Sequence, residues 1–235
     1  MICFVIFLSV KNIECIIKFR TLISNLEPIG SYAYLRTVTG ATKCTFSEEE
    51  ALVAYASDGR KAEFITGRES LRKVLGQLGF APQAILPNAS GVPILPDGAV
   101  GSIAHSRKLC CAIAGHDSDF KALGIDIEGT DRLTAQAAKR VTTADEEVWT
   151  GGDRVRASIL FSLKESFYKM QFPCWNRLAN FDDVSLQVDL TSGTAKIAKI
   201  SSKFGYNLKS LASQVRFNFS LYNSYVVSIC WLRVN

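Results

Sequence analysis

The sequence predicts an α+β protein made of two comparable halves. Stretches with helical periodicity followed by stretches with strand-like alternation occur twice along the chain. The 235 residues are enough for one large domain or two small ones, with ample apolar surface for a core. No internal sequence repeat or low-complexity segment accompanies this order. We place the junction of the halves near residues 117–122.

The N-terminal half opens with two predicted helices. Ser47, followed three residues later by Glu50, has the pattern of a capping box and predicts the start of the first helix. The second helix covers residues 62–78 and ends at Gly79, a residue type common just after a helix. Its apolar stripe consists of Ile65, Leu71, Val74, Leu75 and Leu78.

Strand-like segments follow a loop rich in proline. The stretch APQAILPNASGVPILPDGAVG holds four of the six prolines and predicts a loop with short extended pieces. Strands are predicted at about residues 100–105, 109–114 and 122–128, the last of which opens the C-terminal half.

The C-terminal half repeats the order of helix and strand. Thr143 and Glu146 form a second capping-box pattern, and a helix is predicted from about residue 154 to 170. Four alternating segments then predict antiparallel strands: VSLQVDL, TAKIAKI, QVRFNFSLY and YVVSICWLRV.

We divide the chain into an N-terminal extension (residues 1–30), an N-terminal half (31–120) and a C-terminal half (121–235). The extension begins with apolar residues, but Lys11 and Glu14 interrupt them before the roughly 20 residues that a membrane-spanning helix needs. A signal peptide would need a basic start and a small-residue cleavage site, and neither is clear. We therefore expect a cytoplasmic protein, with membrane contact by the extension as the less favoured alternative.

Charge and cysteine content narrow the function. The net charge of +5 is a mild bias toward anionic ligands or acidic partners, and the scattered basic residues predict no nucleic acid partner. Seven cysteines without C-x-x-C or Cys/His spacing argue against a zinc site or a disulfide framework. We expect buried free thiols in a reducing compartment, with Cys110 and Cys111 in the core.

Two carboxylates stand on one face of a predicted strand in the stretch LGIDIEGTDRL. Leu123, Ile125 and Ile127 would face the core, so Asp126 and Glu128 would share the opposite face, roughly 7 Å apart. Neighbouring anions raise each other's pKa unless a positive charge lies between them, and Mg²⁺ prefers such oxygen ligands. At this point an ordinary solvent-facing strand edge with acidic side chains is the favoured explanation of the pair.

The stretch FSLKESFYKM adds a third carboxylate on a helix. Leu160, Leu163, Phe167 and Met170 form its apolar stripe. Glu165 and Lys169 lie four residues apart on the other side, as a surface ion pair or as part of a site. Lys164 and Lys169 could contact phosphate oxygens. Basic residues elsewhere offer further anion contacts: Arg60, Arg68, Arg72, and His105 with Ser106.

These stretches together resemble the 4′-phosphopantetheinyl transferases. The resemblance runs from about Phe46 to the C-terminus through GRESLRKVLGQLG, GVPILPDGAVGSIAHS, GIDIE and FSLKESFYK, in the order of the family. It is greatest to the branch of enterobactin synthetase component D, which serves siderophore, nonribosomal peptide and polyketide carriers. The resemblance implies two similar α+β halves packed as a pseudo-dimer within one chain, with coenzyme A in the cleft between them.

The resemblance also implies a role for each matching residue. The metal ligands for Mg²⁺, or for Mn²⁺ in its place, would be Asp126, Glu128 and Glu165. The catalytic residues would be Glu165, as the base that acts directly or through water, and Lys169. The residues that hold coenzyme A would be Arg60, Arg68, His105, Ser106, Lys164 and Lys169. Ala104 departs from the hydroxyl residue that commonly precedes this histidine.

The reaction implied is attack of a carrier serine on the β-phosphorus of coenzyme A, with release of 3′,5′-ADP. A divalent cation and a lysine stabilise the charge that builds on the diphosphate, and a carboxylate removes the hydroxyl proton. The partners would be acidic apo-carrier proteins, which a basic enzyme attracts, and we expect a monomer. Two alternatives stay open: a Mg²⁺-dependent nuclease or phosphohydrolase, and a degenerate carrier-binding module without activity.

Overall fold

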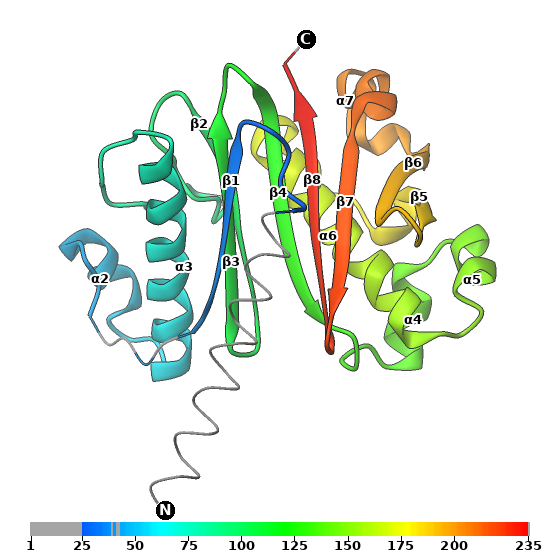
Figure 1. The fold of residues 1–235 in the computed structure, drawn as a ribbon, viewed down its shortest axis with the longest axis horizontal. Coiled ribbons are helices and arrows are strands. Elements are labelled where there is room, and N and C mark those ends of the chain that lie inside the picture. The colour runs from blue at the N-terminus through cyan, green and yellow to red at the C-terminus, as the bar shows by residue number, and fades with distance from the viewer. Residues whose placement is uncertain (1–24, 39, 41–42, 235) are drawn as a thin grey trace, which may run out of the picture.

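The computed structural model describes residues 25–38, 40 and 43–234, which form two antiparallel sheets with a long helix against each (Figure 1). The first sheet has the strand order β1-β3-β2 and the second has the order β4-β8-β7-β6-β5. The α+β class and the two similar halves are therefore confirmed. The predicted extension lies almost wholly outside the described residues, and so does any contact that it makes with a membrane.

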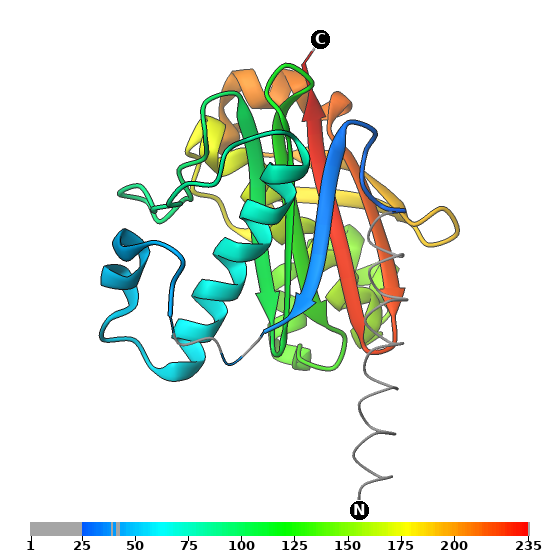
Figure 2. The same cartoon turned by 60° about the vertical axis from the view of Figure 1, so that its left-hand side comes forward.

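The N-terminal half runs from one strand through two helices to two further strands. They are β1 (Ser31–Thr37), α2 (Ser47–Val53), α3 (Asp58–Gln77), β2 (Ala99–Ser106) and β3 (Leu109–His116). The sequence did not predict β1, which pairs antiparallel with β3. Figure 2 shows α3 crossing the face of this sheet.

The C-terminal half is larger. Its elements are β4 (Phe120–Gly129), α4 (Ala135–Val141), α5 (Ala144–Thr150), α6 (Arg154–Trp175), β5 (Val184–Asp189), β6 (Thr194–Ile200), α7 (Gly205–Leu211), β7 (Arg216–Tyr222) and β8 (Tyr225–Arg233). The four predicted tail strands are confirmed. The helices α4 and α7 lacked a clear apolar stripe and were not predicted.

Helix starts differ from the predictions in two places. The helix α2 begins at Ser47, but its capping box does not form, because the Glu50 carboxylate accepts the Cys44 N–H at 2.7 Å instead. The helix α3 begins at Asp58, so Arg60 lies inside it rather than just before it. The predicted box of Thr143 and Glu146 does form at the start of α5.

Three apolar clusters hold the layers together, and the middle one joins the halves. One cluster lies between α3 and the first sheet, and includes Leu71 and Ala112. Another lies between α6 and the second sheet, and includes Leu163 and Phe217. The middle cluster combines residues of both halves: Leu35, Ala104, Cys111, Ile113, Phe120, Leu123, Ile125, Ile127, Val227 and Ile229, with Leu26. The two sheets therefore share one core.

The cysteines in the described residues are free. Cys44, Cys110, Cys111 and Cys230 are buried as expected, whereas Cys174 is exposed. Burial raises the pKa of the Cys110 thiol to about 11, so this thiol stays protonated near neutral pH. Among the helices of the described residues, none is both long and apolar enough to cross a membrane.

Candidate active site

The strand β4 presents its two carboxylates to α6 and not to solvent. Ile125 and Ile127 are fully buried in the cluster that joins the sheets, as the alternation predicted. Asp126 points the other way, yet only 3% of it is exposed. The exposed-edge explanation of the Asp126–Glu128 pair is therefore wrong for Asp126. A carboxylate this deeply buried requires positive charge or hydrogen-bond donors nearby.

Gly124 lets α6 approach the strand closely enough to supply that charge. A Cβ atom at this position would lie 2.0 Å from the Ser166 carbonyl oxygen and 2.7 Å from the Met170 backbone nitrogen. Any larger residue would push the helix away from the strand. The glycine of GIDIE thus sets the separation at which α6 side chains meet Asp126.

Lys169 is the cation that α6 brings to Asp126. Its Nζ donates to Asp126 Oδ1 at 2.5 Å, and its side chain is 28% exposed. Burial disfavours the charged lysine, but the charges of Asp126 and Glu165 outweigh burial, so the pKa of Lys169 is raised. The other oxygen, Asp126 Oδ2, is buried without a hydrogen-bond partner among the described residues. One carboxylate oxygen is thus left to accept a further ligand.

The charge of Asp126 also affects the pKa of the other two carboxylates, Glu165 and Glu128. Burial, and then the charge of Asp126, raise the pKa of Glu165, while Lys169 opposes them. Burial and Asp126 also raise the pKa of Glu128, against Arg132 and Lys169. A raised pKa means that the charged form is disfavoured in the folded protein. An added cation would relieve this repulsion.

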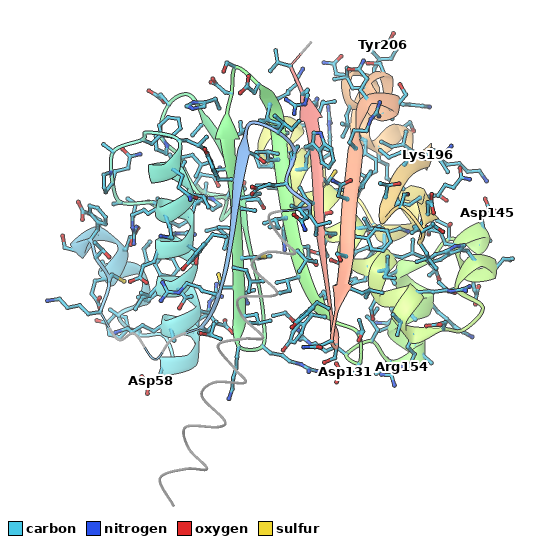
Figure 3. The ribbon with its side chains drawn as sticks, viewed as in Figure 1. Asp58, Asp131, Asp145, Arg154, Lys196 and Tyr206 are labelled. Carbon is cyan, nitrogen blue, oxygen red and sulfur yellow. The ribbon has the colours of Figure 1, made fainter. Side chains whose placement is uncertain are left out.

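Residues of the two halves meet beside these carboxylates, where β2 and β4 lie side by side. Ser106 Oγ lies 3.4 Å from Glu128 Oε2, and Arg132 Nη1 donates to Ser106 Oγ at 3.1 Å. Arg107 of the first half pairs with Asp131 of the second at 2.5 Å. Figure 3 labels Asp131 close to Arg154, whose Nη2 donates to the Asp131 carbonyl oxygen at 2.8 Å.

His105 and Arg60 are brought together on the first half. Arg60 Nη1 lies 3.4 Å from His105 Nε2 and 3.5 Å from Glu63 Oε2. Burial is the largest cause that lowers the pKa of His105; Arg60 and Lys169 lower it further, and Glu63 and Asp126 oppose. His105 lies on β2, which runs beside β4, the strand that carries Asp126.

Two residues expected to hold coenzyme A have other partners. Lys164 is buried, and its Nζ donates to Glu146 Oε2 at 2.6 Å, to the Val141 oxygen at 2.8 Å and to the Phe181 oxygen at 2.7 Å. These three acceptors lie in the C-terminal half, so in this arrangement the ammonium is not free for a phosphate. Lys164 thus links α4, α5 and residue 181, and its expected contact with coenzyme A stays a prediction.

Arg68 is also buried, and its Nε donates to the Ile85 carbonyl oxygen at 2.7 Å. Glu49 Oε1 accepts the N–H of the same Ile85 at 2.8 Å, so this proline-rich loop is fixed at both groups of one residue. The Arg68 guanidinium also lies over the Phe64 ring, 4.6 Å from its centroid. Arg68 therefore positions the loop after α3, whatever else it contacts.

A pocket of about 200 Å³ opens beside Glu165. Its lining includes the aromatic side chains of Phe167, Tyr168, Phe181 and Phe204, and Asn180 adds a polar group. A mainly apolar pocket with a few polar groups suits a small flexible ligand.

The oxygen donors fit a hard divalent cation by their chemistry. Asp126 has a buried oxygen that finds no hydrogen-bond partner in the described part of the chain, and Asp126 raises the pKa of both Glu128 and Glu165. Carboxylate oxygens are the ligands that Mg²⁺ takes in proteins. Within the described residues, however, no three His, Cys, Asp or Glu side chains are grouped closely enough to hold a metal as they stand.

The sequence interpretation missed three residues of this region. Glu63 and Arg132 contact expected site residues, and Glu146 neutralises Lys164. Glu63 lies three residues after Arg60, and Arg132 four after Glu128, so local spacing was the available signal. Glu146 was assigned only to a helix cap, and no spacing pointed to Lys164.

The fold and the site define a class of protein. Paired acidic residues beside a lysine, close to a pocket and to cationic side chains of a second half, are typical of an enzyme that acts on phosphate groups.

Comparison with known proteins names the family. The model described as the 4′-phosphopantetheinyl transferase N-terminal domain matches residues 48–115, and that of the 4′-phosphopantetheinyl transferase superfamily matches residues 122–230. The chain is 37% identical over 172 residues to the 4′-phosphopantetheinyl transferase Svp of Streptomyces mobaraensis, covering 71% of this chain and 70% of Svp. It is 34% identical over 155 residues to PptT of Mycobacterium tuberculosis, covering 63% and 68%. The chain belongs to the 4′-phosphopantetheinyl transferase superfamily and is a transferase.

Solved structures with a similar arrangement include holo-ACP-synthase from Plasmodium yoelii, with 15% identity and a TM-score of 0.40, covering 49% of this chain and 96% of that one. Another is the holo-[acyl-carrier-protein] synthase of Helicobacter pylori in complex with coenzyme A, with 16% identity and a TM-score of 0.37, covering 48% and 99%.

Proposed function

We propose that this protein transfers the 4′-phosphopantetheinyl group of coenzyme A to a serine hydroxyl of an apo-carrier protein, in a reaction that requires Mg²⁺. The observation that carries the proposal is the contact of Asp126 on β4 with Lys169 on α6, with Glu165 one helical turn away. The proposal is supported by an anion and a cation in contact, with a candidate base four residues before that cation on the same helix.

Asp126, Glu128 and Glu165 would hold the metal, for which Mn²⁺ could substitute. When bound, the cation would polarise the diphosphate of coenzyme A and neutralise the charge that develops on its oxygens. The Lys169 ammonium is part-exposed, so it could donate to a diphosphate oxygen.

Glu165 would remove the proton from the serine hydroxyl, directly or through one water. A base works best when its pKa lies nearer to the working pH than that of an ordinary carboxylate. Burial and Asp126 both raise the pKa of Glu165 in this direction. The side chain also borders the pocket, so an acceptor could reach it there.

Coenzyme A would lie across the seam of the halves. Arg60 and His105, with the neighbouring Ser106, would bind the 3′-phosphate end, and Arg68 would act by fixing the loop at Ile85. The pocket bordered by Glu165 and Tyr168 would take the pantetheine arm, whose length is mostly uncharged.

The acceptor would be a small acidic carrier domain of siderophore, nonribosomal peptide or polyketide synthesis, because the chain carries a net charge of +5. Transfer from coenzyme A would take place in the cytoplasm, and we expect the enzyme to act as a monomer.

Intact-mass spectrometry tests the proposal. Incubation of an apo-carrier with the protein, coenzyme A and Mg²⁺ should add one phosphopantetheinyl group, and chelation of the metal should prevent it. Asp126→Asn and Glu165→Gln should each abolish the gain while the protein stays folded by circular dichroism. If no carrier of these pathways or of fatty-acid synthesis gains the mass, the proposal fails.

The alternatives predict different results. A Mg²⁺-dependent nuclease or phosphohydrolase would cleave nucleic acid or phosphate esters without coenzyme A. A degenerate carrier-binding module would bind coenzyme A without transfer. The contact between Asp126 and Lys169 favours transfer, because a module without activity needs no buried ion pair at this position.

A further inference from the structure

Glu63 of α3 stands behind the two groups that would meet the 3′-phosphate of coenzyme A. Its Oε2 lies 3.5 Å from Arg60 Nη1 and 3.8 Å from His105 Nδ1. Neither the sequence patterns nor the reaction chemistry assigned it a role. Its side chain is 29% exposed, less than those of Arg60 (59%) and His105 (40%). The carboxylate is therefore the inner member of the cluster, and Arg60 and His105 are the outer ones.

The contacts fix the orientation of the imidazole. A neutral histidine donates from one ring nitrogen and accepts at the other. Arg60 can only donate, so His105 Nε2, at 3.4 Å, is the acceptor and the proton is on Nδ1, which faces Glu63. If a bound anion attracts the Arg60 guanidinium, His105 Nε2 is left facing that anion. Glu63 would then stabilise the positive charge of a doubly protonated His105 ring.

We propose that Glu63 is a positioning residue that makes the enzyme select coenzyme A over its form without the 3′-phosphate. It holds the long Arg60 side chain in place and orients His105, so that both groups present donors to one phosphate monoester. This inference rests on the proposed function. Repulsion between the Glu63 carboxylate and the 3′-phosphate would oppose binding of coenzyme A. The imidazole ring separates the two anions, however, and charges on half-exposed groups are screened by water.

The test compares coenzyme A with 3′-dephospho-coenzyme A, which has the same reacting diphosphate. The ratio of the two kcat/KM values, from intact-mass rates, and the ratio of the two dissociation constants, from calorimetry, are measured for each variant. Glu63→Ala should lower both preferences about three- to tenfold, as expected for one lost hydrogen-bonding partner, through KM rather than kcat. Glu63→Gln should lose less, because its amide oxygen still accepts.

Glu69→Ala is the matched control. Glu69 is also on α3, is 32% exposed and pairs with Arg36 at 2.8 Å, away from His105. The Glu69→Ala protein should therefore prefer coenzyme A over 3′-dephospho-coenzyme A as strongly as the wild type does. A Glu63→Ala protein that keeps or increases the preference overturns the inference, and so does a wild-type protein that treats both substrates equally. Absence of transfer from either substrate overturns the proposed function instead, and the binding ratios then decide the inference by the same criteria.

Discussion

Lys169 is the residue on which the charge balance of the site depends. Asp126 is buried, and Lys169 is the one cation recorded in contact with it among the described residues. Removing one member of a buried pair leaves an uncompensated charge, which typically costs more than the pair contributes.

We therefore predict that Lys169→Met lowers the free energy of unfolding of the metal-free protein, by up to about 3 kcal/mol because the lysine is partly exposed. Mg²⁺ should raise the melting temperature of Lys169→Met more than that of the wild type, since the cation meets less competition at Asp126. The double variant Asp126→Asn with Lys169→Met should lose this response. Equal Mg²⁺ shifts in all three proteins would contradict the account.

A second residue-scale prediction concerns pH. Burial and Asp126 raise the pKa of Glu165 in the folded protein, so the folded state holds this proton to higher pH than the unfolded state does. The stability that follows is present below the unfolded pKa and is lost as pH rises through the folded pKa.

Between pH 4 and pH 8, without metal, the stability of the wild type should accordingly decrease relative to that of Glu165→Gln. Denaturant unfolding of both proteins across this range measures the difference. Glu147→Gln, which alters an exposed carboxylate of α5, should show no such trend. A difference that stays constant with pH would show that Glu165 is not strained by its neighbours.

At the scale of elements, the packing of α6 on β4 determines whether the site exists. Gly124→Ala would place a methyl group 2.0 Å from the Ser166 carbonyl oxygen. Because this oxygen belongs to the backbone of the helix, no side-chain rotation can relieve the clash. The helix must shift outward, and Lys169 and Glu165 with it. We predict a loss of stability of about 2 kcal/mol and a loss of transfer of at least tenfold.

Gly76→Ala is the control for that substitution. Gly76 lies in α3, has ordinary helical geometry and would bring no atom within 4 Å of a new Cβ. Alanine there should stabilise the protein by about 0.4–1 kcal/mol and leave transfer unchanged. If Gly124→Ala behaves like Gly76→Ala in thermal melts and rates, the close approach is not what forms the site.

The elements also show what a sequence can predict and what it cannot. Strong alternation identified β4 and its inward residues, and the helical stripe of Leu160, Leu163, Phe167 and Met170 identified α6. These are local patterns, set by which face is buried. The acceptors of Lys164 could not be predicted, because Glu146 comes from α5, Val141 from the end of α4 and Phe181 from the 3-10 turn Phe181–Asp183, which no local spacing reveals.

The assignment of Asp126, Glu128, Glu165 and Lys169 to one site came from their resemblance to a family rather than from periodicity. Alone, the strand pattern left an exposed edge open as an explanation. In the structure α6 covers Asp126, so this residue does not lie at an exposed edge. The contact between Asp126 and Lys169 joins residues 43 positions apart in sequence. The roles of the individual residues stay predictions.

At the scale of the whole molecule, the shared core between the sheets couples the two halves. Ile113 and Leu35 of the first half pack in one cluster with Ile125 and Val227 of the second. Either half alone would expose this apolar surface to water, at a free-energy cost of about 25 cal/mol for each Å² exposed. The halves should therefore unfold together, although each has its own sheet and helix.

The distribution of tryptophan makes this testable. All three tryptophans, Trp149, Trp175 and Trp231, belong to the second half, so their fluorescence reports that half, whereas far-ultraviolet circular dichroism reports both. Leu71→Ala removes a fully buried side chain between α3 and the first sheet, at an expected cost of about 2–5 kcal/mol.

With one cooperative transition, Leu71→Ala should move the urea midpoint by the same amount in fluorescence and in circular dichroism, although no tryptophan lies in the cluster that it changes. Phe217→Ala, in the cluster under α6, is the reciprocal control and should again shift both signals equally. A Leu71→Ala protein whose dichroism midpoint falls while its fluorescence midpoint stays at the wild-type value would show that the halves unfold separately. The site at their seam would then depend on docking between two independent units rather than on one shared core.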